Sequence, residues 1–292
     1  MREVHLTLEA NDGHPLAGTL FEPARRAIGA VLINAATGAP RRYYRPYAEF
    51  LATQGFVVLT YDYRGIGGSR FHAGPASALT MSAWGREDLA AALQYLHWHY
   101  PRLPLLTVGH SAGGQLLGLA ANNHLVDGAL AIASQSGYWG HWPARLQPVM
   151  AALWYGVLPL TARLLGRIPA ALMGAELPAG VAREWARWCR HPDYMHDEAG
   201  QPLRKHFEAF RGPMRFYAIA DDHFYAPPRA VTALAGFYRN AHSLVRTLSP
   251  QDYGLRAIGH FGFFRPSMPR AAWQETADWL RSVAQPPLRQ AA

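Results

Sequence analysis

The segment LLTVGHSAGGQLLGLA (residues 105–120) places one serine, Ser111, between an apolar run and a helical pattern of small residues. An apolar run of this length is typical of a buried strand, and the residues after Ser111 continue as a helix. In open parallel sheets, ligands bind at the carboxyl ends of the strands, where strand turns into helix. The segment therefore predicts that Ser111 lies on a tight turn at a binding edge.

The pattern around this segment extends the same arrangement to most of the chain. Residues 27–36 and 56–63 are further continuous apolar runs, as expected for parallel strands buried on both faces. Helical patterns separate these runs, whereas alternating residues near the start (3–9 and 16–21) predict an antiparallel hairpin at the sheet edge. We therefore expect an α/β fold with a mostly parallel sheet.

This alternation stops after Ser136 and resumes near residue 212. The intervening residues are rich in Trp, Pro and Arg and lack strand-like runs, which predicts a helical insertion. The expected organisation is a first core part (1–136), a helical cap (137–211) and a second core part (212–292). A last strand is expected within SLVRTLS or YGLRAIGH.

Composition excludes several function classes. The chain has 292 residues and a net charge of +8, but its arginines are scattered, Lys205 is the only lysine, and no basic run reaches five residues. We therefore expect no nucleic-acid partner. The single cysteine, Cys189, excludes an intramolecular disulfide and a multi-cysteine metal site, and we expect it to be a packing residue.

Location and membrane contact follow from two further patterns. The first residues alternate apolar and polar types instead of forming a leader-like apolar stretch, so a cytoplasmic location is expected. The longest uncharged run, residues 146–162, contains Pro148 and Pro159. We expect it to be a buried or lid helix, without stable membrane insertion.

The glycines around Ser111 point to nucleophilic chemistry. A serine on a strained strand-to-helix turn needs small residues two positions away, which Gly109 and Gly113 supply. The following helix directs its positive dipole end at the site, where an oxyanion would form. The alternative is a Gly-Ser turn that only caps the helix.

A nucleophilic serine requires a histidine base and an orienting carboxylate. Of the histidines after the insertion, His223 follows an acidic pair, His242 ends a predicted helix, and His260 lies between two glycines in a loop. The loop position favours His260. Asp221 and Asp222 follow the penultimate strand, and either could orient the base.

Backbone N–H groups are the expected oxyanion donors. The N–H of Ala112, directly after the nucleophile, is one, and the N–H of Ala36 in the loop LINAATGAP is the other. The alternative for this loop is an ordinary strand-to-helix turn. Small side chains there would let a substrate carbonyl approach closely.

Together these residues resemble the serine-hydrolase branch of the α/β-hydrolase superfamily, over essentially the whole chain. The resemblance implies Ser111, Asp222 and His260 as catalytic triad and a cap after the sixth strand. We expect no cofactor and no metal. The family commonly has His-Gly where Asn34 and Ala35 stand here. The motifs that carry the resemblance are LINAATG, YDYRGIGGS (61–69), GHSAGGQ (109–115), LPAGVAREWARWC (177–189), ADD and GHFGFFR (259–265).

One motif has a rival interpretation. DYRGIGGS is similar to a dinucleotide-binding glycine pattern, but Arg70 stands where the third glycine is required. A structural loop is the expectation.

The expected activity is hydrolysis of an ester-like bond through an acyl-enzyme on Ser111. The rivals are a thioesterase, a lipase-like hydrolase, a peptidase, an acyltransferase, and a binding protein without catalysis. Large aromatic walls favour a small, mainly apolar acyl substrate, with Trp185 and Trp188 affecting acyl preference or folding of the insertion. The tryptophans of the insertion are Trp139, Trp142, Trp154, Trp185 and Trp188.

Overall fold

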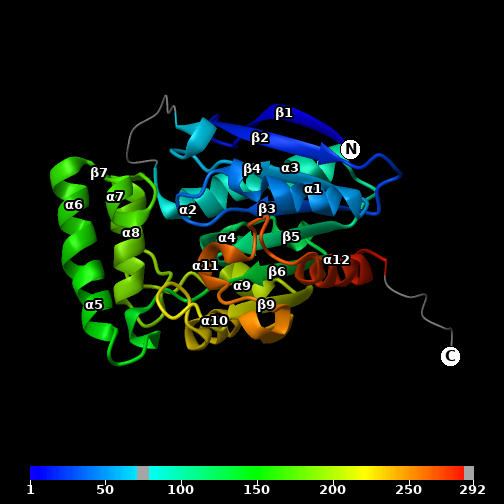
Figure 1. The fold of residues 1–292 in the computed structure, drawn as a ribbon. Helices are drawn as coiled ribbons and strands as arrows, with labels where there is room; N and C mark the ends of the chain where they lie inside the picture. Colours follow the sequence, from blue (N-terminus) through cyan, green and yellow to red (C-terminus); the bar gives the residue numbers. More distant parts are fainter. Residues whose placement is uncertain (71–78, 286–292) are drawn as a thin grey trace.

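The computed structural model describes residues 1–70 and 79–285 and has an eight-stranded mixed sheet at its centre (Figure 1). The strand order is β1-β2-β4-β3-β5-β6-β9-β10, and β1–β2 and β2–β4 are the antiparallel pairs. All other neighbours are parallel, which confirms the predicted α/β-hydrolase fold. The strands are β1 (Arg2–Glu9), β2 (Pro15–Glu22), β3 (Gly29–Asn34), β4 (Phe56–Tyr61), β5 (Leu105–His110), β6 (Gly128–Ile132), β9 (Pro213–Ile219) and β10 (His242–Leu248).

Burial of the strands explains their sequence patterns. Every residue of β3, β4 and β5 is buried, because these central strands are covered on both faces. The edge strand β1 has exposed positions between partly buried ones, as the predicted hairpin requires. Of the two candidates for the last strand, residues 243–248 belong to β10, and residues 254–258 form a loop that leads to His260.

Helices flank the sheet and join its strands. α1 and α12 lie side by side, with the Tyr47 hydroxyl 2.7 Å from the Thr276 hydroxyl. In α12 the buried Trp273, Ala277 and Leu280 recur at helical spacing, which fixes the face that meets the core. The core helices are α1 (Arg45–Thr53), α2 (Met81–Ala83), α3 (Ala90–His99), α4 (Ala112–Leu116), α9 (Lys205–Ala209), α10 (Pro228–Ala235), α11 (Gly259–Gly262) and α12 (Arg270–Ala284).

The DYRGIGGS motif forms a loop that supports the segment after β3. The Asp62 carboxylate accepts a 2.8 Å hydrogen bond from the Gly68 N–H and pairs with the Arg41 guanidinium. Gly67 has φ +51°, and a Cβ there would lie 2.5 Å from Asp62 Oδ2. The glycines of this motif therefore serve loop geometry, as the structural interpretation predicted.

Residues 137–211 lie between β6 and β9 in the chain, and we call them the cap segment. Its helices α5 (Gln147–Ala152), α6 (Leu158–Leu165), α7 (Ala170–Met173) and α8 (Ala179–Arg190) lie together beyond one end of the sheet (Figure 1). A small antiparallel pair, β7 (Arg167–Ile168) with β8 (Leu177–Pro178), joins them. The final helix of the segment, α9, packs against the core, because Phe207 contacts Tyr238.

A π-helical turn (Leu153–Val157) joins α5 and α6 into one continuous helix, Gln147–Leu165. By length and composition this helix could cross a membrane, and only 22% of its most apolar 18-residue window is buried. The helix is thus largely exposed, so the expectation of a buried helix is wrong and the expectation of a lid stays a prediction.

Candidate active site

Ser111 occupies the turn between β5 and α4 with φ 52° and ψ −117°. A non-glycine residue in this region is strained and persists only where its surroundings hold it. The Ser111 N–H donates to the Ile132 carbonyl at 2.9 Å, which anchors the turn to β6. The serine thus has the tight-turn conformation that its sequence context predicts.

The two flanking glycines are required by close backbone contacts. A Cβ on Gly109 would lie 2.4 Å from the Gly114 Cα, inside the first turn of α4. A Cβ on Gly113 would lie 2.1 Å from the Asn34 carbonyl oxygen on the neighbouring strand β3. Both glycines therefore admit close backbone contacts, Gly109 across the Ser111 turn itself, as predicted, and Gly113 against the neighbouring strand β3.

His260 and Asp222 form a buried hydrogen-bonded pair. The His260 Nδ1 lies 2.6 Å from Asp222 Oδ2, and the Tyr225 N–H donates to the other carboxylate oxygen at 3.1 Å. The imidazole also stacks on the Tyr225 ring, with centroids 4.9 Å apart. These contacts fix the orientation of the His260 ring at the edge of the site.

Asp221 has a different set of partners. Its carboxylate accepts from the N–H groups of Ile258 and Gly259 at 3.0 and 3.1 Å, so it holds the loop that carries His260. His223 and His242 are both exposed, and His242 begins β10 instead of ending a helix. The structure therefore brings His260 and Asp222 together and leaves the other two histidines outside the site.

Ser111 and His260 line the same cavity. Within residues 1–70 and 79–285, the Ser111 hydroxyl makes no hydrogen bond to His260 Nε2. Such bonds are often long in proteins without substrate and shorten when a ligand fills the site.

A chain of hydrogen bonds, absent from the sequence-based prediction, connects three loops of the site. The Ala36 N–H donates to the Tyr44 Oη at 2.8 Å, and the Tyr44 hydroxyl lies 2.8 Å from His110 Nδ1. The His110 Nε2 lies 2.8 Å from the His260 carbonyl oxygen. A carbonyl only accepts, so Nε2 carries the proton and Nδ1 accepts from Tyr44.

Burial, reinforced by the neighbouring His260, holds the pKa of His110 well below its usual value. A neutral imidazole is what this chain of bonds requires, because Nδ1 must accept a proton. The sequence signal that could have identified His110 is its place directly before Ser111. Tyr44 lies in a segment, RRYYRP, that carries no comparable signal.

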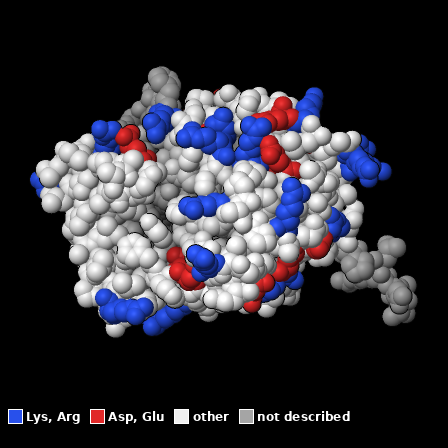
Figure 2. All heavy atoms as spheres, in the orientation of Figure 1, with Lys and Arg blue, Asp and Glu red and all other residues white. Residues whose placement is uncertain are grey.

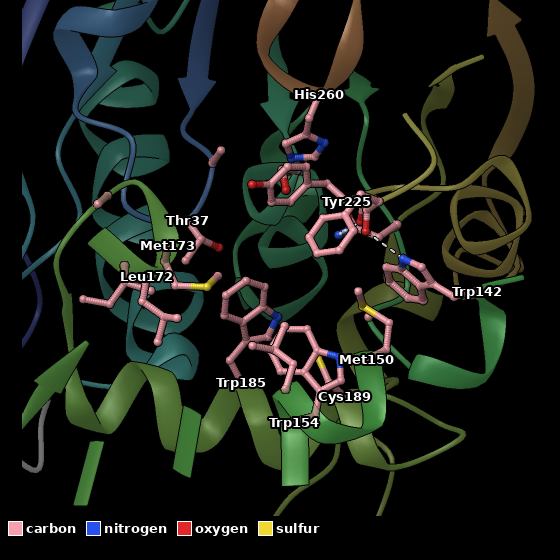
Figure 3. Close-up of a pocket in the computed structure, with 18 of the residues that line it drawn as sticks. Thr37, Trp142, Met150, Trp154, Leu172, Met173, Trp185, Cys189, Tyr225 and His260 are labelled. Carbon is pink, nitrogen blue, oxygen red and sulfur yellow. Dashed lines mark hydrogen bonds between the residues drawn. The ribbon is translucent and has the colours of Figure 1, made fainter. Parts of the chain in front are cut away.

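The expectation of a free Ala36 N–H is not met, because Tyr44 already accepts from it. The neighbouring Thr37 lines the cavity, and its hydroxyl is buried without a hydrogen-bond partner among the described residues. In Figure 3 this hydroxyl points into the cavity. Ala112 begins α4, so the helix offers its N–H no acceptor.

The cavity has a volume of about 270 Å³ and lies between the core and the cap segment (Figure 3). Most of its wall is apolar, and Trp154 and Trp185 meet edge to face at 4.9 Å on the side opposite His260. Burial raises the pKa of the Cys189 thiol well above its usual value, so this wall residue stays neutral. Its aromatic, aliphatic and sulfur-bearing lining residues are Trp142, Met150, Leu153, Trp154, Leu172, Met173, Leu177, Trp185, Cys189, Phe224, Tyr225 and Phe261.

The tryptophans of the cap segment differ in position. Trp142, Trp154 and Trp185 line the cavity. Trp188 is fully buried elsewhere, and its indole N–H donates to the His196 carbonyl at 2.9 Å. Of the two residues expected to affect acyl preference or folding, Trp185 therefore meets the cavity and Trp188 is a core residue of the cap segment.

No group of three or more His, Cys, Asp or Glu side chains in the described part of the chain is placed to hold a metal ion.

Comparisons with known proteins agree with this fold. The family model described as Serine aminopeptidase, S33 matches residues 27–224. Curated proteins give no match. The esterase domain of a Rhodothermus marinus protein superposes with a TM-score of 0.62 at 19% identity, covering 98% of this chain and 100% of that chain. An esterase of Pyrococcus furiosus superposes with a TM-score of 0.62 at 15% identity, covering 97% and 92% of the two chains.

A carboxyl esterase of Bacillus coagulans, in complex with glycerol, superposes with a TM-score of 0.60 at 16% identity, covering 98% and 100%. At these identities the solved structures establish the fold alone, whereas the family model covers more than half of the chain. The chain therefore belongs to the serine aminopeptidase S33 family, within the α/β-hydrolase superfamily.

Proposed function

We propose that the protein is a serine hydrolase of the carboxylesterase type, with Ser111, His260 and Asp222 as its catalytic triad. The observation that carries the proposal is the buried 2.6 Å bond between His260 and Asp222, in a cavity that also contains the strained Ser111. A buried carboxylate holds an imidazole in the tautomer whose free nitrogen accepts a proton.

In the proposed reaction, His260 Nε2 takes the Ser111 proton while the serine oxygen attacks the ester carbonyl carbon. The protonated His260 then donates to the leaving alcohol, which departs as the acyl-enzyme forms. Water attacks the acyl-enzyme, with His260 as base, and releases the acid and free Ser111.

The Ala112 N–H is one proposed oxyanion donor, because it follows the nucleophile at the start of α4. For the second donor we propose the Thr37 hydroxyl, supported by its burial without a described partner and its direction into the cavity. The originally expected Ala36 N–H could serve only by leaving Tyr44. A preorganised donor of this kind stabilises the charge that develops in the transition state.

The proposed substrate is a small ester with an apolar acyl group. The cavity of about 270 Å³ is lined mostly by apolar side chains, which suits a small apolar acyl group. An aminopeptidase would need a carboxylate to bind the substrate ammonium group. Among the described cavity residues there is no Asp or Glu, which favours an ester over a peptide with a free amino terminus.

Labelling with a fluorophosphonate probe tests the nucleophile. Wild-type protein should be labelled and Ser111→Ala should not, with unchanged melting temperature and a kcat at least about 10³-fold lower. Folded wild-type protein that resists the probe and every substrate would instead indicate a binding protein.

A substrate panel tests the reaction class. It contains p-nitrophenyl esters from acetate to decanoate, the matching acyl-CoA thioesters, and alanine p-nitroanilide. We expect the highest kcat/KM on esters of intermediate chain length and none on the anilide. Faster turnover of thioesters, or acyl transfer to an added alcohol in preference to water, would assign a thioesterase or an acyltransferase to the same triad.

A further inference from the structure

The continuous helix Gln147–Leu165 presents a long apolar face to solvent. Leu160, Leu164 and Leu165 are 56, 70 and 58% exposed. Monomeric soluble proteins rarely expose contiguous apolar patches of this kind without an interaction partner. Val157, Leu160 and Leu164 recur at helical spacing, and Val149 and Leu165 lie toward the two ends of the helix. We call these five residues the lid face.

Arginines make up most of the charge around the lid face. Residues 137–175 contain Arg145, Arg163 and Arg167 but no Asp or Glu. Arg145 and Arg163 are exposed near the two ends of the helix, and Arg167 pairs with Glu176. In Figure 2 the cap side of the molecule is largely uncoloured, with most of its charged groups basic and at its margins.

The fold excludes a single membrane crossing by this helix. The cap segment leaves the sheet at β6 and returns at β9, and these two strands are paired neighbours. A single crossing would place the two ends of the helix, and so β6 and β9, on opposite sides of the membrane. The helix can only lie along a surface, with its apolar side immersed and its arginines at head-group level.

We propose that the lid face docks the protein reversibly on an anionic lipid bilayer. The apolar side chains supply the burial, and the exposed arginines at both ends supply the attraction to acidic head groups. The nearby Glu176 is paired with Arg167. Arg145 and Arg163 have no ion-pair partner among the described residues, so the apolar face with its arginine ends has the charge complementarity that such a surface requires.

A second copy of this chain fits the lid face less well. In an antiparallel two-fold pairing of the helix, Arg145 of one copy would approach Arg163 of the other. In a parallel pairing, Arg163 would meet its own counterpart. The carboxylate that follows this stretch, Glu176, already pairs with Arg167, so self-association would bring Arg145 and Arg163 together as like charges.

Docking would connect the bilayer to the proposed reaction. Met150, Leu153 and Trp154 belong to the same helix and line the cavity that contains Ser111. Apolar esters concentrate in a bilayer, so a docked lid helix would place the cavity next to its substrate. This consequence rests on the proposed function, whereas the docking itself does not.

Co-sedimentation with vesicles tests the inference. The full chain is mixed with vesicles of phosphatidylcholine alone, or of phosphatidylcholine and phosphatidylglycerol in equal parts. We expect binding to the mixed vesicles to be at least about tenfold tighter and to weaken as salt is raised. Arg163→Gln should weaken binding about fivefold on the mixed vesicles and leave it unchanged on neutral ones.

The apolar contribution is tested with the double variant Leu160→Gln, Leu164→Gln. It should weaken binding to the mixed vesicles at least about tenfold while turning over a soluble ester at the wild-type rate. The matched control is Leu244→Gln, a 55% exposed leucine on β10 in the core, which should bind as wild type.

Three results would overturn the inference: wild-type protein that stays in the supernatant with both vesicle types, equal loss of binding in Leu244→Gln, or a dimer in light scattering that only the double variant dissociates. Ser111→Ala should sediment as wild type, because docking requires no turnover. A protein that docks but resists the fluorophosphonate probe would therefore contradict the proposed function and leave this inference standing.

Discussion

Beside Ser111, the core contributes a line of bonded polar groups, whereas the cap segment contributes indoles without partners. Around Ser111, a line of buried hydrogen bonds runs from the Ala36 N–H through Tyr44 and His110 to the His260 carbonyl. In the cap segment, the indole N–H groups of Trp139 and Trp154 are buried without a hydrogen-bond partner among the described residues. The Thr37 hydroxyl of the core is also buried without a described partner, so the fully bonded part of the core is this line from Ala36 to His260.

This difference suggests that the bonded core groups serve the chemical step and that the cap segment serves substrate selection. A buried donor without a partner costs about 1–3 kcal/mol, so the cap segment gains when water or a ligand completes its bonds. The bonded line from Ala36 to His260 gains nothing from such adjustment and holds its groups in one geometry. We therefore expect substitutions in the core to change the chemical step, and substitutions in the cap segment to change which substrate is turned over.

The largest expected effect is the loss of kcat when Asp222 is replaced. Asp222→Asn presents an amide where His260 Nδ1 needs an acceptor, so kcat should fall about 10⁴-fold with little change in melting temperature. Asp221→Asn is the matched control. It loses one acceptor for the Ile258 and Gly259 N–H groups, which should cost about tenfold or less in kcat through loop disorder. A larger kcat loss in Asp221→Asn at unchanged stability would reverse the two roles.

The second prediction concerns the oxyanion donors. Thr37→Val keeps the shape of the side chain and removes its hydroxyl, so kcat should fall about 10²- to 10³-fold on every ester, with KM nearly unchanged. Thr37→Ser keeps the hydroxyl and should retain most activity. If Thr37→Val kept the wild-type kcat, the second oxyanion donor would instead be the Ala36 N–H, which would first have to break its hydrogen bond to Tyr44.

Local patterns predicted the fold because they follow from burial. Continuous apolar runs such as β3 to β5 are required where a strand is covered on both faces, and Gly109 and Gly113 are required where backbones nearly touch. Burial patterns could not distinguish Asp222 from Asp221, because two adjacent carboxylates differ only in the direction of their side chains. The family resemblance was the reason to expect Asp222 in the triad.

The remaining site features depend on contacts between distant segments. Tyr44 and His110 are 66 residues apart, and only the packing of the loop after β3 onto β5 makes them neighbours. The bond from the Ala36 N–H to the Tyr44 hydroxyl likewise depends on packing that the sequence pattern does not show. Exposure of the lid helix depends on which of its faces α8 covers, and composition alone does not show that.

The third prediction contrasts two tryptophans of one helix, α8. Trp185→Ala enlarges the cavity and should shift the kcat/KM ratio of octanoate to butyrate esters by about tenfold or more, toward the longer chain. Trp188→Ala removes a fully buried side chain and should lower the free energy of unfolding by about 3–5 kcal/mol. Its ester preference should not change. Equal shifts in preference in both variants would contradict a cavity-specific role for Trp185.

The smallest expected effect appears in the pH dependence of stability. His110 has a pKa well below its usual value in the folded protein, because burial disfavours its charge. In the unfolded chain its pKa is about 6.5. Below that pH, His110 binds a proton in the unfolded state but stays neutral in the folded state. The free energy of unfolding should therefore decrease as the pH falls. The contribution of one such group is at most about 1.4 kcal/mol per pH unit.

The variant His110→Gln isolates this contribution, because it removes the titrating group and leaves the other histidines in place. Urea unfolding followed by circular dichroism, from neutral pH down to about one unit below the unfolded-state pKa, gives the slope for both proteins. We expect a shallower slope for the variant, since its folded and unfolded states differ by one proton fewer. Equal slopes would mean that folded His110 accepts the proton, and the Tyr44 hydroxyl would then have to release Nδ1. In that case the hydrogen bonds from Tyr44 to His110 would rearrange with pH. The expectation that these core groups keep one geometry, while the cap segment rearranges around a ligand, would then be wrong.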